Sequence, residues 1–257
     1  MKIMTFNVRV DIPIVDENSW SNRMGKVAKV IHQENPMIIG LQEAKKVMIS
    51  DLVCELPNYQ WAGEPRRKDD ECSPILYRSD MVELVETGTF WLSETPFVEG
   101  SISWDSSYPR ICTWGEFSLT ENPNKRFRVF NTHLDHMSEE ARTHGVRLIW
   151  DIINQLNNKK PLPSMLMGDL NDYPDSETVQ FCEKKMQLIN AFSIMDHEEH
   201  VRKTFHDFEG GDEGEPIDYI FVSPDVKLVE AQIIRSMING LYPSDHYPLT
   251  LMVEILK

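Results

Sequence analysis

Short apolar runs and longer segments with apolar residues at helical spacing alternate along the whole chain. The short runs predict β-strands at residues 2–8, 37–42, 73–78, 82–91, 111–119, 127–134, 164–168, 217–222, 226–235 and 249–256. Helical spacing predicts helices at residues 18–34, 45–56, 138–156 and 175–185. Residues 93–109 are rich in proline, glycine and serine and are typical of a long loop, which in a compact domain often carries function.

Strands and helices interleave without any change in composition that would mark a domain boundary. We therefore expect one domain spanning residues 1–257. Two packed sheets covered by helices, an α+β fold, is the simplest architecture for these elements. The apolar fraction of 41% is sufficient for a sizeable core.

The formal net charge of −15 restricts the partners of the protein. A surface of this sign repels a long polyanion, so we do not expect a long DNA duplex as a ligand. A small phosphate compound or a short single strand suits this charge better. We expect no obligate protein partner.

The cysteines and the apolar segments predict a reduced, cytoplasmic setting without membrane insertion. The four cysteines form no CxxC pair and are typical of buried, reduced thiols. No stretch is long and apolar enough to span a membrane. The first ten residues carry charges and already resemble a strand, which leaves no room for a signal peptide before it.

Polar residues repeatedly stand at or beside the ends of the expected strands. Any one of them has an ordinary interpretation as a turn residue, but their recurrence indicates a site. Asn, Asp and Glu offer the hard oxygen ligands that suit Mg²⁺ or Mn²⁺. The HLDH and HEEH segments, residues 133–136 and 197–200, lack the i, i+4 spacing of a helical zinc site. The strand-end residues are Asn7, Glu43, His133, Asp169, Asn171, Asp218, Asp245 and His246.

Six motifs that contain these residues follow one another between residues 5 and 248. They are TFNVR, LQE, NTHLDH, GDLND, IDYIF and SDHYP. Their order resembles the endonuclease/exonuclease/phosphatase superfamily, which includes DNase I, the inositol polyphosphate 5-phosphatases and the nocturnin-type deadenylases. The resemblance implies a four-layer α/β/β/α sandwich with two mixed sheets packed face to face. It also implies a metal-dependent phosphoesterase.

The resemblance implies a metal site and a group that activates water. Glu43, with Asn7 and Asp245, would hold Mg²⁺ or Mn²⁺. Asp169 would orient and deprotonate the attacking water, with Asn171 helping to place it. Asp169 would alternatively hold a second ion.

The remaining implied roles concern the phosphate. Asp218 would accept a hydrogen bond from His246, which would favour a cationic ring that binds the phosphate. His133 would bind the phosphate or assist the leaving group, oriented by Glu71. Arg110, in YPRICTW, resembles the phosphate-contacting arginine of the family.

The substrate class stays open between nucleotides and other phosphate compounds. The FWLSETP stretch, residues 90–96, is similar to bacterial proteins near the nocturnin branch, which favours a nucleotide or short nucleic acid and 3′→5′ exonuclease chemistry. Four aromatic residues are candidates for stacking on a base. Each of them could instead pack in the core or anchor a loop: Trp91, Trp104, Tyr108 and Trp114. The basic run of residues 66–68 has two interpretations: it would bind a second phosphate, or it would form a solvated loop. The acidic residues 207–215 would repel phosphate chains if they line the mouth of the site.

Two alternatives to a nucleotide hydrolase remain. One is a phosphatase or phosphodiesterase acting on a small sugar, inositol or lipid phosphate. The other is a non-catalytic binding module on the same fold, which the complete set of candidate metal and histidine residues disfavours.

Overall fold

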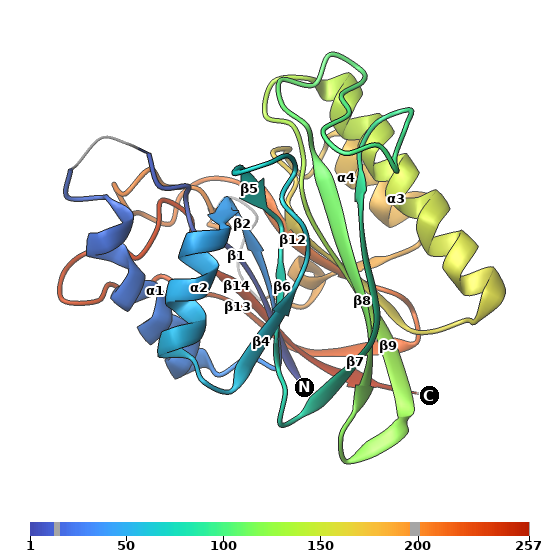
Figure 1. Ribbon diagram of the computed structural model, residues 1–257, viewed down its shortest axis with the longest axis horizontal. Coiled ribbons are helices and arrows are strands. Elements are labelled where there is room, and N and C mark those ends of the chain that lie inside the picture. Colours follow the sequence, from blue (N-terminus) through green and yellow to red (C-terminus); the bar gives the residue numbers. More distant parts are fainter. Residues whose placement is uncertain (13–15, 196–200, 257) are drawn as a thin grey trace.

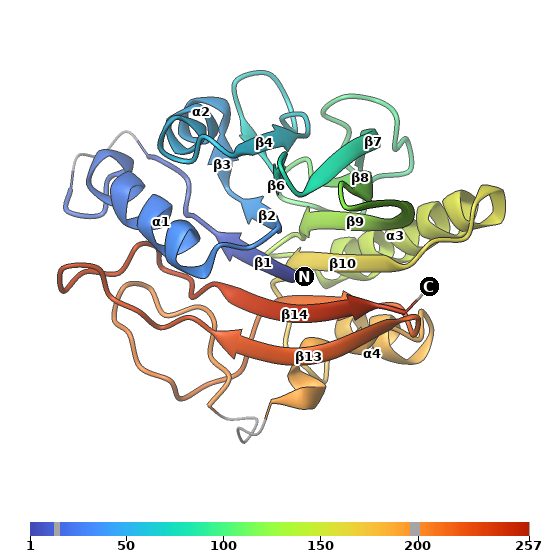
Figure 2. The same cartoon turned by 90° about the horizontal axis from the view of Figure 1, so that it is seen from below.

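Two six-stranded β-sheets lie face to face at the centre of the protein, and helices cover the outer face of each (Figures 1 and 2). The structure is a computed structural model that describes residues 1–12, 16–195 and 201–256, so the HEEH segment lies outside the described residues. This arrangement confirms the predicted α+β fold of four layers, α/β/β/α.

The first sheet joins the two ends of the chain to the segments around residues 38–78. Its strands β1 and β2 are parallel, whereas all other neighbours are antiparallel, so the sheet is mixed. In spatial order it contains β13 (Val226–Ile233), β14 (Leu249–Ile255), β1 (Lys2–Asn7), β2 (Ile38–Gln42), β6 (Ile75–Arg78) and β4 (Tyr59–Ala62).

The second sheet is also mixed, because β9 and β10 are parallel and the other pairs are antiparallel. In spatial order it contains β11 (Ile189–Asn190), β12 (Asp218–Val222), β10 (Ser164–Asp169), β9 (Asn122–His133), β8 (Ile111–Leu119) and β7 (Val82–Trp91). A separate two-stranded ladder pairs β3 (Ala44–Lys45) with β5 (Glu71–Cys72).

Two pairs of helices form the outer layers. The first sheet is covered by α1 (Trp20–Glu34) and α2 (Lys46–Glu55), and the second by α3 (Glu139–Lys159) and α4 (Glu177–Lys184) (Figure 1). A short 3₁₀ helix, η1 (Ala191–Ile194), follows β11. Across the described part of the chain, no helix has both the length and the apolar character needed to cross a membrane.

Alternation along β1 shows how the layers are assembled. Ile3 belongs to the core cluster between the sheets, whereas its neighbour Met4 packs with Trp20 and Val27 in the cluster under α1. Successive side chains of a strand point to opposite faces. A strand buried on both faces therefore reads as a continuous apolar run, which is the pattern seen in the sequence.

The expected strands and helices are all present, with ends that differ by a few residues. Strand β9 begins at Asn122, earlier than predicted, because a polar and largely exposed stretch extends the hairpin with β8. Five elements are too short to show a periodic pattern and were not predicted: β3, β4, β5, β11 and η1. Of the free cysteines, Cys54 is exposed and so corrects the expectation that all four thiols are buried.

A buried amide network joins the two sheets near the ends of their strands. Asn131 Nδ2 donates hydrogen bonds to the carbonyl oxygens of Leu41 and Pro74, each at 2.8 Å, and Gln42 Nε2 donates to Asn131 Oδ1 at 2.7 Å. Residue 40 must be glycine here, because a Cβ at Gly40 would lie 2.5 Å from Asn131 Oδ1. The network fixes the spacing and the relative position of the sheets.

We expect Asn131→Ala to lower the free energy of unfolding by about 3 kcal/mol, because it removes three buried hydrogen bonds and leaves a cavity in the network. Urea denaturation followed by circular dichroism measures this loss. Asn124→Ala, at an exposed position of the same strand, is the matched control and should change little. A loss below about 1 kcal/mol for Asn131→Ala would show that the network is not needed to hold the sheets together.

Candidate active site

The ends of several strands from both sheets meet at one edge of the sandwich. Asn7 ends β1, His133 ends β9 and Asp169 ends β10. The predicted residues that line a common cavity of about 430 Å³ there are Glu43, Glu71, Arg110, His133, Asp169, Asn171, Asp245 and His246. Asn7 and Asp218 are buried and are hydrogen-bonded to members of this set. The structure thus brings all the sequence-predicted site residues together.

Unusual backbone conformations direct several of these side chains into the cavity. Glu43 and Asn171 have positive φ angles of 60° and 50°, so the chain turns sharply directly after β2 and β10. Residues held in this region without being glycine are often found at functional sites. Gly168 has a φ of 148°, and a Cβ there would lie 2.0 Å from the carbonyl oxygen of Thr132, so only glycine allows β10 to approach β9.

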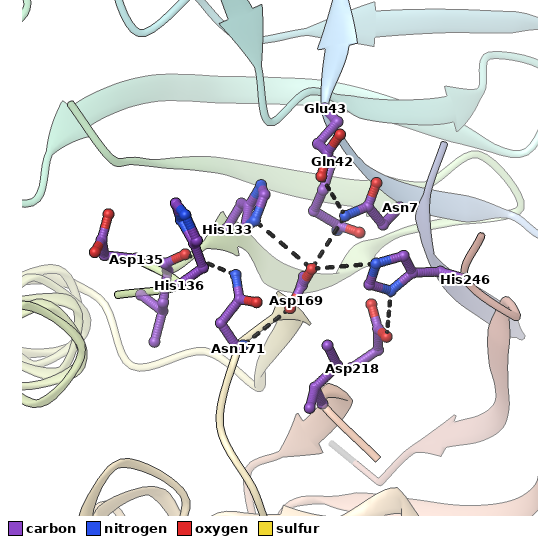
Figure 3. A network of polar contacts seen from close by, with 12 residues as sticks. Asn7, Gln42, Glu43, His133, Asp135, His136, Asp169, Asn171, Asp218 and His246 are labelled. Carbon is purple, nitrogen blue, oxygen red and sulfur yellow. Dashed lines mark hydrogen bonds and ion pairs between the residues drawn. The ribbon is translucent and has the colours of Figure 1, made fainter. Parts of the chain in front are cut away.

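Asp169 lies at the centre of the polar network (Figure 3). Its Oδ2 accepts a hydrogen bond from Asn7 Nδ2 at 3.0 Å, and its Oδ1 accepts one from the backbone N–H of Asn171 at 2.9 Å. His133 Nε2 and His246 Nε2 approach Oδ2 to 3.6 Å and 3.8 Å. The carboxylate is therefore held between two histidines that point at it from opposite sides.

Burial and charge make Asp169 a stronger base than an ordinary aspartate. Its side chain is almost completely buried, and this burial, followed by the negative charge of Asp218, raises its pKa. The cation of His246 and the hydrogen bonds from Asn7 and Asn171 oppose this shift without cancelling it. A raised pKa improves the ability of a carboxylate to accept a proton from water.

His246 is held in its protonated form by carboxylates. Burial alone would lower its pKa, but Asp218, Asp169 and Asp245 outweigh burial and raise the pKa to about 10. Its Nδ1 lies 2.9 Å from Asp218 Oδ2, and with the ring protonated this nitrogen donates the hydrogen bond. The other nitrogen, Nε2, is directed at Asp169 and the cavity (Figure 3).

His133 has the opposite protonation preference. Burial lowers its pKa well below the ordinary value, and the positive charges of Arg110 and His246 lower it further. The site therefore contains one cationic and one neutral histidine on either side of the same carboxylate. Titratable groups whose pKa values are pushed apart in this way are suited to different acid and base roles.

Glu71 does not make the expected direct contact with His133. Its Oε1 accepts a hydrogen bond from Arg66 Nη2 at 3.0 Å instead. The carboxylate that approaches His133 is that of Asp169, with 3.6 Å between Nε2 and Oδ2. A small cavity of about 10 Å³, lined by Glu71, Arg66, Arg110 and His133, has room for roughly one water between Glu71 and the histidine.

Arg110 is buried and held in position by a second, unpredicted carboxylate. Its Nε lies 3.4 Å from Asp135 Oδ2, and its Nη2 lies 3.1 Å from His136 Nδ1. Asp135 Oδ1 in turn accepts the backbone N–H groups of Met137 and Ser138. The sequence signal for Asp135 was available, because it lies in the NTHLDH motif two residues after His133.

The oxygen donors near Glu43 fit a divalent cation. Asn7 Nδ2 donates to Glu43 Oε1 at 3.0 Å, and Asp245 lines the same cavity. Burial raises the pKa of Asp245, and the carboxylate of Glu43 raises it further. The cation of His246 opposes this shift without cancelling it. A cation such as Mg²⁺ or Mn²⁺ would relieve this repulsion between carboxylates, and hard oxygen ligands are those it prefers.

A second group of possible ligands lies deeper in the site. Donor atoms of Asp169, Asp218 and His246 all lie within 4.8 Å of one another. Asp218 and His246 already satisfy each other through their hydrogen bond, and a cationic histidine does not bind a metal. The chemistry of the donors therefore favours Glu43, Asn7 and Asp245 as the cation site.

The pairing of these carboxylates and histidines at the edge of two facing mixed sheets defines a class of protein, the phosphoester hydrolases of the four-layer sandwich fold. The chain belongs to the Endonuclease/Exonuclease/phosphatase family, whose sequence pattern matches residues 4–246. It is accordingly a hydrolase that acts on phosphate esters.

Relatives of known structure support the family assignment over the whole chain. The mannosyl-6-phosphatase Bt3783 from Bacteroides thetaiotaomicron is 29% identical, with a TM-score of 0.90 over 99% of each chain. The catalytic domain of human nocturnin, with bound sulfate, is 18% identical, with a TM-score of 0.76 over 99% of this chain and 94% of that one. At that identity the likeness to nocturnin concerns the fold alone.

A viral relative is similar over a shorter region. The uncharacterized protein L388 of Acanthamoeba polyphaga mimivirus is 30% identical over 164 residues. The matched region spans 59% of this chain and 59% of the viral protein.

We expect Asp218→Asn to lower the pKa of His246 by about one unit or more, because an adjacent opposite charge is lost. In the metal-free parent the ring should stay protonated at pH 8, since its pKa is about 10. Histidine NMR titration of EDTA-treated protein measures both values. Asp212→Asn, in the exposed loop, is the control. An unchanged titration of His246 in Asp218→Asn would contradict the assigned pairing.

Proposed function

We propose that the protein is a divalent-metal-dependent phosphatase that removes phosphate from a small, hydroxyl-rich phosphomonoester. The observation that carries the hydrolytic part of this proposal is the placement of buried Asp169 between neutral His133 and cationic His246 in one compact cavity. This arrangement supplies a base, a cationic phosphate ligand and a neutral hydrogen-bond donor within a single site.

Water activation falls to Asp169 in this mechanism. Its raised pKa allows its carboxylate to accept the proton of an attacking water. Asn171 lines the same cavity, and its backbone N–H fixes Asp169 Oδ1. The side chain of Asn7 holds Oδ2, so the carboxylate cannot rotate away from the water that it orients.

The phosphate is held by groups that keep their positive charge. His246 presents Nε2–H, and Arg110 presents its guanidinium from the opposite sheet. Preorganised donors of this kind stabilise the charge that develops in the transition state. Neutral His133 would donate a hydrogen bond to the leaving-group oxygen.

The cation would be held by Glu43 and Asp245, with Asn7 beside them. When bound, a divalent ion neutralises charge on a phosphate oxygen and thereby lowers the barrier for attack by water. Mg²⁺ and Mn²⁺ both prefer oxygen donors of the kind present here.

The aromatic residues considered for base stacking are mostly engaged elsewhere. Trp91 Nε1 donates to the carbonyl oxygen of Arg66, Trp114 is buried and stacks on Phe130, and Trp104 stacks on His144. Tyr108 alone of the four lines the cavity. Phe205 also lines the cavity and is 42% exposed. The described residues therefore offer two exposed aromatic side chains at the cavity and not a longer row for many successive bases, which argues for a small substrate.

The contacts of the basic run, residues 66–68, do not fit a second phosphate site. Arg66 is buried and paired with Asp70 and Glu71, and Arg67 is paired with Asp70. Lys68 lines a different cavity. No residue of the acidic stretch 207–215 lines the candidate active site, so its expected repulsion of phosphate chains acts at most from a distance.

A phosphatase of a sugar phosphate is consistent with the similarity to the mannosyl-6-phosphatase. A hydrolase of a nucleotide or short nucleic acid is the second candidate, because Tyr108 is available to stack on one base. Family membership removes the support for a non-catalytic module. The cytoplasmic setting and the lack of an obligate protein partner remain predictions.

We expect Asp169→Asn and His246→Ala each to lower kcat by about 10²–10⁴-fold, because each removes a group that acts in the transition state. Release of inorganic phosphate from a panel of sugar phosphates and nucleotides measures the rate. Asp212→Asn should retain full activity. Near-parental turnover by either site variant, with the fold intact by circular dichroism, would refute these roles.

We expect EDTA to abolish turnover, and Mg²⁺ or Mn²⁺ to restore it. In Glu43→Gln the cation concentration that gives half-maximal rate should rise at least about tenfold, because a charged oxygen ligand is lost. Glu64→Gln, at an exposed carboxylate outside the cavity, is the matched control. Metal-independent turnover, or equal cation requirements in parent and Glu43→Gln, would contradict the cation site.

A further inference from the structure

One wall of the active-site cavity consists of residues that the mechanism does not use. Arg66, Glu71 and Tyr108 line the cavity together with the catalytic groups. Arg66 and Glu71 come from the segment around β5, and Tyr108 comes from the long loop between β7 and β8. The wall therefore joins two segments that are far apart in the sequence.

Arg66 is held rigidly in this wall. Its backbone N–H donates to the carbonyl oxygen of Glu71 at 2.8 Å, and its own carbonyl oxygen accepts from Trp91 Nε1 at 2.6 Å. Its guanidinium lies 3.0 Å from Glu71 Oε1 and 3.1 Å from Asp70 Oδ2. Arg66 is only 7% exposed, so these contacts fix its position before any ligand binds.

The charges of the wall are unsuited to a second phosphate. Two guanidinium groups, those of Arg66 and Arg67, face two carboxylates, those of Asp70 and Glu71, so the group has no surplus positive charge. Another phosphate would meet the repulsion of these carboxylates. Neutral hydroxyl groups can instead donate to the carboxylate and accept from the guanidinium.

Tyr108 adds an aromatic surface to this polar pair. Tyr108 is 41% exposed as a residue, and 4.7 Å separate the Arg66 guanidinium carbon from the centroid of its ring. It also stacks on His136 at 6.0 Å with an interplanar angle of 22°. Arg66 and His136 thus hold the ring in position, while the residue as a whole stays exposed at the cavity.

We propose that Arg66, Glu71 and Tyr108 form the subsite for the alcohol part of the substrate and select a sugar ring. The aromatic ring would pack against the C–H face of the sugar, and the Arg66–Glu71 pair would exchange hydrogen bonds with neighbouring hydroxyls. This proposal rests on the proposed function, since it assumes a phosphomonoester bound through the same cavity. It assigns Arg66 and Tyr108 a role in specificity, whereas Glu71 also faces the small cavity that it shares with His133.

The test compares two substrates that share the phosphate and differ in the alcohol. Phosphate release with Mg²⁺ is measured for mannose 6-phosphate and for ethyl phosphate, which lacks the ring and its hydroxyls. In Tyr108→Ala the ratio of the two kcat/KM values should fall at least about tenfold, mainly through KM for the sugar phosphate, whereas Tyr108→Phe keeps the ring and should retain most of the ratio. Circular dichroism establishes that the variants are folded.

Arg67→Ala is the matched control, because Arg67 is adjacent in sequence and contacts Asp70 but does not line the cavity. It should keep the parental ratio. If the parent hydrolyses both substrates and Tyr108→Ala keeps the ratio, the subsite is wrong while the phosphatase stands. Adenosine 5′-monophosphate is measured as a third substrate. If Tyr108→Ala lowers kcat/KM for this nucleotide and not for mannose 6-phosphate, the sugar class is wrong. If the parent hydrolyses no phosphomonoester, the proposed function itself fails.

Discussion

The hydrogen bond between Asn7 and Asp169 links the two halves of the active site. Asn7 ends β1 in one sheet and Asp169 ends β10 in the other, and the amide donates to the carboxylate at 3.0 Å. The same amide nitrogen donates to Glu43. The expected cation ligand and the expected base are therefore held by one side chain, and their spacing depends on how the sheets are packed. The nearby network of Gln42 and Asn131 keeps that packing in register.

Burial then gives chemically similar residues different properties. His133 and His246 flank the same carboxylate, but the pKa of His133 is lowered by burial and by Arg110, whereas Asp218 and its neighbours raise that of His246. Water would screen the charges that shift these two pKa values. Both rings are nearly completely buried, so the charges act on them at close to full strength. The division of labour in the site is thus a consequence of the fold around each ring.

Much of the fold could be predicted because its elements have strong local patterns. Strand β1 is a continuous apolar run, and α1 has one apolar face, so both were located to within two residues. The short β4, with two buried positions, gives no such pattern. Most of the candidate site was found because its residues follow strands in recognisable motifs. Arg66 was described as part of a basic run, since its burial depends on pairing with Glu71 and on packing under Tyr108.

By itself, the sequence determined the layer architecture and the identities of the reactive side chains. Periodicity is a local property, and residues such as Asp169 and His246 have the same functional groups wherever they lie. Only the tertiary structure decided their protonation, the partner of Glu71 and the composition of the wall around the substrate. Those properties depend on distances between residues far apart in the chain, and on the exclusion of water that occurs when the two sheets pack together.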